Sequence, residues 1–470
     1  MLEYMLEIAE KVLNMALGKG ARDAVVRVQY KTYESIVFDN GVMRSCSISR
    51  VSGVSLTVYV GGVVGYSYTS VLDDRALART VEEALAIART VGERVPEQEL
   101  KSIELRSARG VYRTDYKVDP LSVDLDTKTK LIGTLNSESM KKEGIVSAFT
   151  RYGFERDKKV VVSSFGSNVG VDVMAIGVAH TAVARHGEVV ERVYDQKTFI
   201  GGYEYIDSFD WASFVDDINN LAIKTSQAPT ITPGTYEVVV DSELVGLLLH
   251  EAFGHASEGD IVYAELSVLR DKMGRKIASD IVTIVDEGLV QGGYPVPYDD
   301  EGVKKERTYV VKDGVLVGFL HSICTARKLG QSVTGNARAQ DITFNPIVRQ
   351  TNFYMMPGDA EVEELFEGIE YGLYLRGRGA GGGQVDTSMG TFTFGVGPSY
   401  VIRNGEAAEL VRGVIVSGNI LKTLMDVDMV GKDLSISTSV FGGCGKDGQM
   451  VRVGGGGPHV RIKKVVVGTR

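Results

Sequence analysis

The chain has 470 residues, of which 44% are hydrophobic and 24% charged, and its formal net charge is −9. This length predicts two or three domains, and this composition is that of an ordinary globular protein rather than a fibre or a disordered chain. The acidic balance argues against a nucleic-acid partner, and the apolar runs are shorter than the roughly 18 residues of a membrane span, so we expect no membrane segment.

Residues 1–225 alternate predicted helices with β-hairpins. The first helix carries acidic residues among its apolar ones, which is unlike a secretion signal. Asn40-Gly41 and Gly61-Gly62 stand at predicted hairpin turns, and Asp73 is placed to cap a helix over 73–91. Further helices near 127–142 and 209–224 flank strands from 145 to 184. We predict an N-terminal α+β region, with a possible split into two sub-domains near 95–120.

The segment 226–234 contains two prolines and marks the predicted domain boundary. Residues 235–470 are rich in glycine and predicted strands, with hairpin turns at Asp313-Gly314 and Asn404-Gly405. Short helices are expected over 244–256, 360–371 and 420–426. The prediction for the whole chain is an α+β fold whose C-terminal β domain is antiparallel and barrel-like and carries the helix at 244–256.

That helix holds the motif HEAFGH, in which His250, Glu251 and His255 have the pattern H-E-x-x-x-H. Two imidazoles can bind a divalent metal while the adjacent carboxylate acts as general base toward water, as in zinc peptidases. Residues five apart diverge by about 140° on an ideal helix. The two histidines can converge only if the helix is distorted, for example by a π-bulge, which Gly254 would permit.

Further histidines, cysteines and acidic residues are candidates for this site. The chain has six histidines and three cysteines; the odd number and wide spacing of the cysteines predict a reducing compartment, so we expect a cytoplasmic protein. Cys444 lies in the glycine-rich stretch FGGCGKDGQ, and thiolate is a strong zinc ligand. His180 and His186 fall in predicted strands or turns and are expected to be structural. Glu258 and Asp260 follow the motif closely enough to bond a ligand imidazole, although helix capping or solvation is the simpler role.

The glycines at 381–383 are candidates for backbone pairing with a substrate, and a plain bulge or turn is the alternative explanation. GRGAGG, from Gly377 to Gly382, formally matches a dinucleotide-binding pattern. It is followed by a predicted strand, QVDTSMGTFTFGVG, instead of the helix that such a site requires. Nucleotide binding is therefore not expected.

Six motifs in order along the chain resemble the TldD branch of the TldD/PmbA family: HEAFGHASEGD, YDDEG, TGNAR, GGGQVD, MVGKDL and CGKDGQ. The resemblance implies a zinc metallopeptidase with one Zn²⁺ per active subunit, held by His250, His255 and Cys444, and with Glu251 at the catalytic position. It also implies a site enclosed in a dimer, formed by two copies or with a PmbA-type paralogue.

Our hypothesis from the sequence is a zinc peptidase that hydrolyses short or unfolded polypeptides. Two alternatives stay open. The chain could be a regulatory or scaffolding subunit with a structural zinc, although such a site would not need Glu251 beside a ligand. It could also be a thiol peptidase with Cys444 as nucleophile and a histidine as base, which a chelator would not inhibit.

Overall fold

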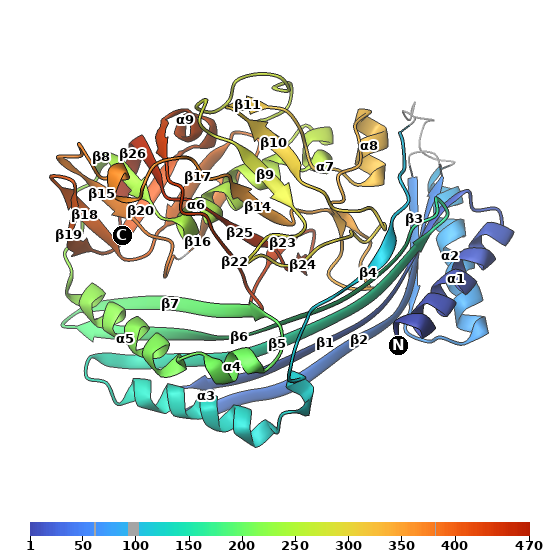
Figure 1. The fold of residues 1–470 in the computed structure, drawn as a ribbon, viewed down its shortest axis with the longest axis horizontal. Helices are drawn as coiled ribbons and strands as arrows, with labels where there is room; N and C mark the ends of the chain where they lie inside the picture. Colours follow the sequence, from blue (N-terminus) through green and yellow to red (C-terminus); the bar gives the residue numbers. More distant parts are fainter. Residues whose placement is uncertain (61–62, 93–102, 381) are drawn as a thin grey trace.

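The computed structural model describes residues 1–60, 63–92, 103–380 and 382–470. Its N-terminal part is built on one long arched sheet, with helices at its two ends (Figure 1). The helices are α1 (Leu2–Gly18), α2 (Asp74–Gly92), α3 (Leu125–Met140), α4 (Glu204–Ser208) and α5 (Trp211–Gln227). The strands are β1 (Asp23–Asp39), β2 (Val42–Val60), β3 (Val63–Thr69), β4 (Arg109–Arg113), β5 (Ile145–Ser163), β6 (Asn168–His186) and β7 (Val189–Ile200), and a 3₁₀ turn, η1, spans Pro120–Ser122.

The arched sheet has the strand order β3-β2-β1-β5-β6-β4, and β7 also pairs with β6. Strands from both sides of residues 95–120 share it; residues 93–102 lie outside those described. Helices α1 and α2 cover an apolar cluster at one end of the sheet, and α3, α4 and α5 cover another at the opposite end. The Asn40-Gly41 turn is confirmed, because both residues have positive φ and join β1 to β2. Gly61 and Gly62 lie outside the described ranges.

The C-terminal half lies over the middle of this arched sheet (Figure 1). Its helical segments are α6 (Ser242–Leu248), the π-turn η2 (Leu249–Gly254), η3 (His255–Ser257), α7 (Gly259–Tyr263), α8 (Ile323–Leu329), η4 (Glu363–Leu365) and α9 (Ile420–Met425). Its first strands are β8 (Gly234–Val240), β9 (Ile284–Glu287), β10 (Thr308–Lys312), β11 (Val315–Leu316), β12 (Ala337–Arg338), β13 (Ile347–Val348), β14 (Asn352–Met355) and β15 (Tyr371–Leu375). The remaining strands are β16 (Gly382–Asp386), β17 (Thr391–Gly395), β18 (Ser399–Arg403), β19 (Glu406–Val411), β20 (Val414–Asn419), β21 (Val427–Val430), β22 (Ser435–Thr438), β23 (Cys444–Lys446), β24 (Gln449–Val451), β25 (Gly454–Gly457) and β26 (Val460–Thr469).

Two larger sheets organise this half. One has the order β11-β10-β9-β14-β25-β22, and the other β16-β17-β20-β26-β8-β15-β18-β19, with β21 also on β26. The α+β class is confirmed, but among the described strands the sheets are open and mixed, not one antiparallel barrel. β8 pairs in parallel with β15, and β14 with β25, while β16 and β19 remain as edges of the larger sheet.

The prediction of a helix over 360–371 is also wrong. Only the short 3₁₀ turn η4 forms there, and β15 begins at Tyr371. The sequence has helix-forming residues, but Gly368 has φ 81°, and the following residues pair with β8 and β18. Sheet pairing therefore overrides the local helical preference. The helices expected over 244–256 and 420–426 are present, the first with a distorted second half.

The helix α6 lies against both sheets and shares one apolar core with them. Gly246 is required by this packing, because a Cβ there would lie 2.6 Å from the backbone nitrogen of Gly456 on β25. Asp241 caps the helix by accepting a hydrogen bond of 2.9 Å from the backbone N–H of Leu244. The start of the helix is therefore fixed by β8, and its direction by β25.

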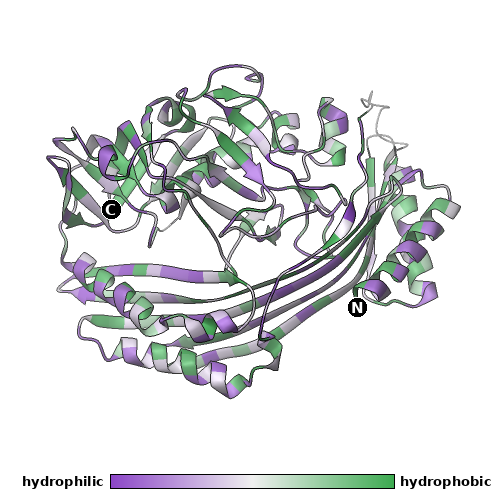
Figure 2. Cartoon of the chain, in the orientation of Figure 1, coloured by the Kyte–Doolittle hydropathy of each residue, from purple (hydrophilic) through white to green (hydrophobic). Residues whose placement is uncertain are grey.

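The contact between the arched sheet and the C-terminal half combines buried ion pairs with two apolar clusters, which include Ile323 and Val440 of the C-terminal half. The middles of β1 and β5 are largely hydrophilic (Figure 2). Asp300, from the YDDEG motif, lies 2.9 Å from Lys159 Nζ and 3.1 Å from Arg27 Nη1, with both basic residues on the sheet. Arg452 forms an ion pair of 2.8 Å with Glu155 on β5. These buried pairs and the two apolar clusters together hold the C-terminal half on the sheet. None of the helices in the described ranges is long and apolar enough to cross a membrane.

Candidate metal centre

The two histidines of the H-E-x-x-x-H motif lie on the same side of a distorted helix. Helix α6 continues into the π-turn η2, in which the backbone N–H of His255 donates to the carbonyl of His250, five residues earlier. The wider turn compensates for the five-residue spacing, and the two imidazole rings have centroids 5.2 Å apart with planes at 80°. The predicted distortion is present over Leu249–Gly254, although Gly254 itself has ordinary helical backbone angles.

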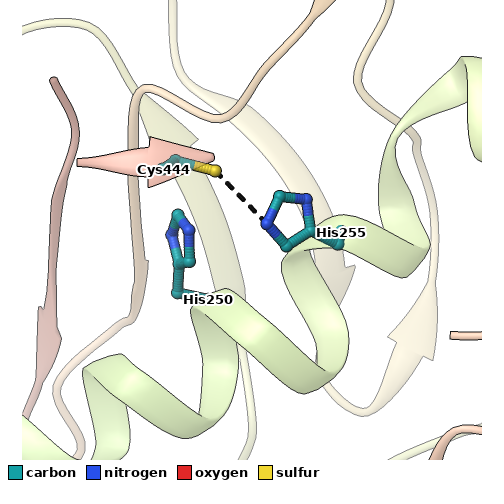
Figure 3. Close-up of side chains that lie close together, drawn as sticks. All are labelled: His250, His255 and Cys444. Atoms are coloured by element: carbon teal, nitrogen blue, oxygen red, sulfur yellow. Dashed lines mark hydrogen bonds between the residues drawn. The ribbon is translucent and has the colours of Figure 1, made fainter. Parts of the chain in front are cut away.

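Cys444 reaches this helix from β23, which forms a hairpin with β24. The turn has Asp447 and Gly448, both with positive φ, which is the hairpin signal that the motif CGKDGQ contained. The thiol Sγ lies 3.2 Å from His255 Nε2, and one donor atom of each of the three residues lies within 4.8 Å of the others (Figure 3). The structure thus brings together the three residues that the sequence singled out as metal ligands.

The chemistry of this donor set fits zinc. Two imidazole nitrogens and one thiolate are borderline and soft donors, and catalytic zinc sites use three protein ligands with a further position left for water or substrate. Burial alone would raise the pKa of the Cys444 thiol, but the neighbouring His250 and His255 outweigh it and lower that pKa to about 5. Cys444 is therefore a thiolate at neutral pH, the form that binds metal.

A carboxylate and a lysine lie on the side of the His255 ring that faces away from Cys444. His255 Nδ1 lies 3.0 Å from Glu258 Oε2, and the Lys446 ammonium lies 2.9 Å from the same oxygen and 2.7 Å from Asp260. Burial raises the pKa of Glu258, but His255 and Lys446 outweigh it and lower that pKa to about 2. Burial likewise lowers the pKa of His255, yet Glu258 and Cys444 raise it to about 11. Glu258 thus orients the imidazole through Nδ1 and leaves Nε2 directed at Cys444.

Lys446 was missed by the sequence reasoning, although it stands two residues after Cys444 in the same motif. Asp260 bonds Lys446 and the backbone N–H of Ile261; the described contacts do not include one with an imidazole. Of the two acidic residues considered, Glu258 is the one that reaches His255.

Glu251 directly follows His250 in the sequence, and its side chain is half-buried. Within the described part of the chain, its carboxylate makes no hydrogen bond or ion pair with a protein group. Glu258 and Asp260 are both paired with Lys446, so among the described acidic groups beside the donors it is Glu251 that is free to accept a proton from another molecule.

The other predicted residues lie as follows. Gly382 and Gly383 are on β16, an edge strand that packs beside the π-turn, whereas Gly381 lies outside the described residues. His180 is buried in the arched sheet, where Nδ1 lies 2.9 Å from the Thr150 hydroxyl, and His186 is exposed at the end of β6. Neither of these histidines is near the three donors, which agrees with the structural role predicted for them.

Known proteins are similar to this chain in sequence and in fold. The family model described as "PmbA/TldA metallopeptidase C-terminal domain" matches residues 233–469, and the one described as "PmbA/TldA metallopeptidase domain 1" matches residues 24–88. A metalloprotease of Methanothermobacter thermautotrophicus is 35% identical over 96% of this chain and 98% of its own length. The chain belongs to the TldD/PmbA metallopeptidase family.

Further relatives agree with this membership. A protein of Saccharolobus solfataricus named as a zinc metalloprotease TldD homologue is 35% identical over 67% of this chain and 68% of its own length. TldE from Thermococcus kodakarensis has the same fold, with a TM-score of 0.75 and 18% identity over 98% of this chain and 99% of that one. A Thermotoga maritima chain proposed to modulate a DNA gyrase superimposes with a TM-score of 0.78 and 22% identity, covering 98% of this chain and 99% of its own. These two structures bear on the fold alone, whereas the names of the sequence relatives indicate a metal-dependent peptidase family.

Proposed function

We propose that this TldD/PmbA family member is a zinc peptidase, with the metal held by His250, His255 and Cys444 and with Glu251 as general base. The observation that carries the proposal is the convergence of three donor atoms within 4.8 Å beside a carboxylate that has no partner in the described chain. A structural zinc site has no use for such a carboxylate, so this arrangement favours catalysis over the scaffolding alternative.

When bound, zinc supplies Lewis-acid chemistry: it polarises a peptide carbonyl and increases the acidity of water. Glu251 would accept a proton from the attacking water and then donate it to the amine of the leaving peptide. Glu258 and Lys446 would hold the His255 ring in place through its far nitrogen during these transfers. His250 and His255 would be neutral as metal ligands, with Cys444 as the thiolate.

The experiment that tests this function is metal analysis of the purified protein, paired with cleavage of an unfolded polypeptide before and after chelation. The expected result is about one zinc per chain, loss of cleavage on chelation and recovery on adding zinc back. Protein that binds no zinc, or cleavage that persists after the metal has been removed, would contradict the proposal.

A second candidate function is favoured by one observation. The Cys444 thiolate lies 3.2 Å from His255 Nε2, a geometry that a thiol peptidase would also use. The two candidates differ in one outcome: a thiol peptidase stays active after chelation and is inactivated by alkylation of Cys444 in the chelated protein.

We further propose that the substrate binds as an extended chain in a cavity completed by a second subunit, either another copy or a PmbA-type paralogue. The position of the edge strand β16 beside the π-turn supports it, because an exposed strand edge can pair with an extended backbone. The test compares one polypeptide in native and denatured forms, together with peptides of shuffled sequence. Equal cleavage of both forms, or strict dependence on one side chain, would contradict it.

A further inference from the structure

All three candidate ligand residues are linked to one short segment of the chain, Val348–Gln350, which we call the clamp segment. It begins at Val348, the last residue of β13, and the side chains of Arg349 and Gln350 are completely buried. Its own backbone is fixed: the carbonyl of Arg349 accepts a hydrogen bond of 2.8 Å from Asn336, and that of Gln350 one of 2.8 Å from Arg338. Both donors belong to the TGNAR motif, so this motif has a structural explanation.

Gln350 contacts the π-turn. Its amide Nε2 donates a hydrogen bond of 3.1 Å to the carbonyl of His250, the same carbonyl that closes the π-turn with the N–H of His255. The amide rests on Gly254, where a Cβ would lie 2.2 Å from Gln350 Oε1. Gly254 has φ −61° and ψ −47°, which any residue adopts. The glycine at this position therefore provides room for the Gln350 amide, and no special backbone conformation requires it.

The other two residues of the clamp segment reach the other two ligands. The Arg349 guanidinium donates to the carbonyl of Cys444 and, over 3.4 Å, to that of Gln449 on the paired strand, so it holds both strands of the hairpin. The carbonyl of Val348 accepts a hydrogen bond of 3.0 Å from Lys446, whose partner Glu258 contacts His255. Three consecutive residues are thus each linked to a different ligand.

We propose that the clamp segment presets the spacing of the three ligands before the metal binds, and that Gln350 is the positioning residue for the π-turn. This inference rests on the proposed zinc site. Gln350 itself does not coordinate the metal; it acts through the His250 carbonyl, and thereby fixes how far the His250 ring stands from the His255 ring.

The test measures zinc affinity, by competition with a chromophoric chelator, in the full-length wild type and in Gln350→Ala, Gly254→Ala and the double variant. Removing a partner that orients a ligand lowers metal affinity by about 10–100-fold, and we expect this loss for Gln350→Ala. Gly254→Ala should lose at least as much, because its methyl group displaces the amide. The double variant should bind zinc no more weakly than Gly254→Ala, since the methyl then has nothing to displace.

Gln29→Ala is the matched control. Gln29 is also completely buried, makes one side-chain hydrogen bond of 2.7 Å, to Asp157, and has a buried oxygen with no partner, but it lies in the arched sheet. This variant should lower the melting temperature as Gln350→Ala does and leave zinc affinity unchanged. In the cobalt-substituted protein, the visible spectrum should shift for Gln350→Ala and not for Gln29→Ala.

Three outcomes would overturn the inference: an unchanged zinc affinity and cobalt spectrum in Gln350→Ala, losses that multiply in the double variant, or an equal loss in Gln29→Ala. Failure of the wild type to bind zinc is a different result, because it would remove the proposed function on which the inference rests.

Discussion

Replacing Glu251 by glutamine separates catalysis from both folding and metal binding. The amide has nearly the same shape but cannot accept a proton, and a general base contributes about 10²–10⁴ to the rate, or about 3–5 kcal/mol of the barrier. The free energy of unfolding should change by less than about 0.5 kcal/mol, because the carboxylate has no protein partner in the described chain. Zinc content should also be unchanged, since this side chain is not among the three donors.

The assay is the turnover number for an unfolded polypeptide at saturating concentration, measured alongside zinc content and the urea midpoint of the same preparation. Glu243→Gln is the control, because Glu243 is an exposed acidic residue at the start of the same helix. The control should keep full turnover. A Glu251→Gln protein with near wild-type turnover would refute the general-base assignment, and one that has lost its zinc would show that the carboxylate supports the metal instead.

Three further predictions concern metal binding, acid stability and the contact with the arched sheet. Cys444→Ser should lower zinc content without unfolding the chain, because a hydroxyl is a much poorer zinc ligand; full occupancy by metal analysis would mean that another residue is the third ligand. Burial, partly opposed by the hydrogen bond to Asn219, lowers the pKa of His180 from 6.5 to about 4, so the fold excludes a proton that the unfolded chain binds. This contribution to stability is complete above pH 6.5 and is lost as the pH falls toward 4; urea unfolding across that window should show a smaller decrease for His180→Gln than for the wild type. Asp300→Asn should destabilise the protein by about 3–5 kcal/mol, because buried Arg27 loses its ion-pair partner and buried Lys159 keeps only Asp157, 3.5 Å away, among the described residues; a urea midpoint equal to that of the wild type would contradict this.

The features that the sequence predicted correctly depend on neighbouring residues. The hairpin turns at Asn40, Asp313 and Asn404 were predicted because a type I′ turn needs two consecutive residues that accept positive φ. An Asn or Asp followed by Gly meets this requirement and can be recognised in the sequence. The π-turn was found for a similar reason, since the spacing of His250 and His255 cannot serve one metal on a regular helix.

The features that were missed depend on residues far apart in the chain. The local sequence around 360–371 favours a helix, and only the pairing of β15 with β8 and β18 decides otherwise. The clamp segment was invisible for the same reason: Gln350 is a hundred residues from His250, and Arg349 is ninety-five from Cys444. Nothing in their immediate sequence indicates these contacts. The resemblance to a known family implied which residues are the ligands, but it did not indicate the residues that position them, such as Arg349 and Gln350.

The position of β26 between β8 and β20 has a consequence for folding kinetics. β8 immediately precedes the helix with His250 and His255, and Cys444 lies shortly before β26, so the pairing of Val240 with Val460 joins the two ends of the C-terminal half. Contacts so distant in sequence form slowly. The helix therefore carries His250 and His255, two of the three metal donors, before these contacts bring Cys444 beside them. Zinc uptake with all three donors should thus coincide with the last step of folding, and the rate at which the metal becomes resistant to chelation would time the insertion of β26.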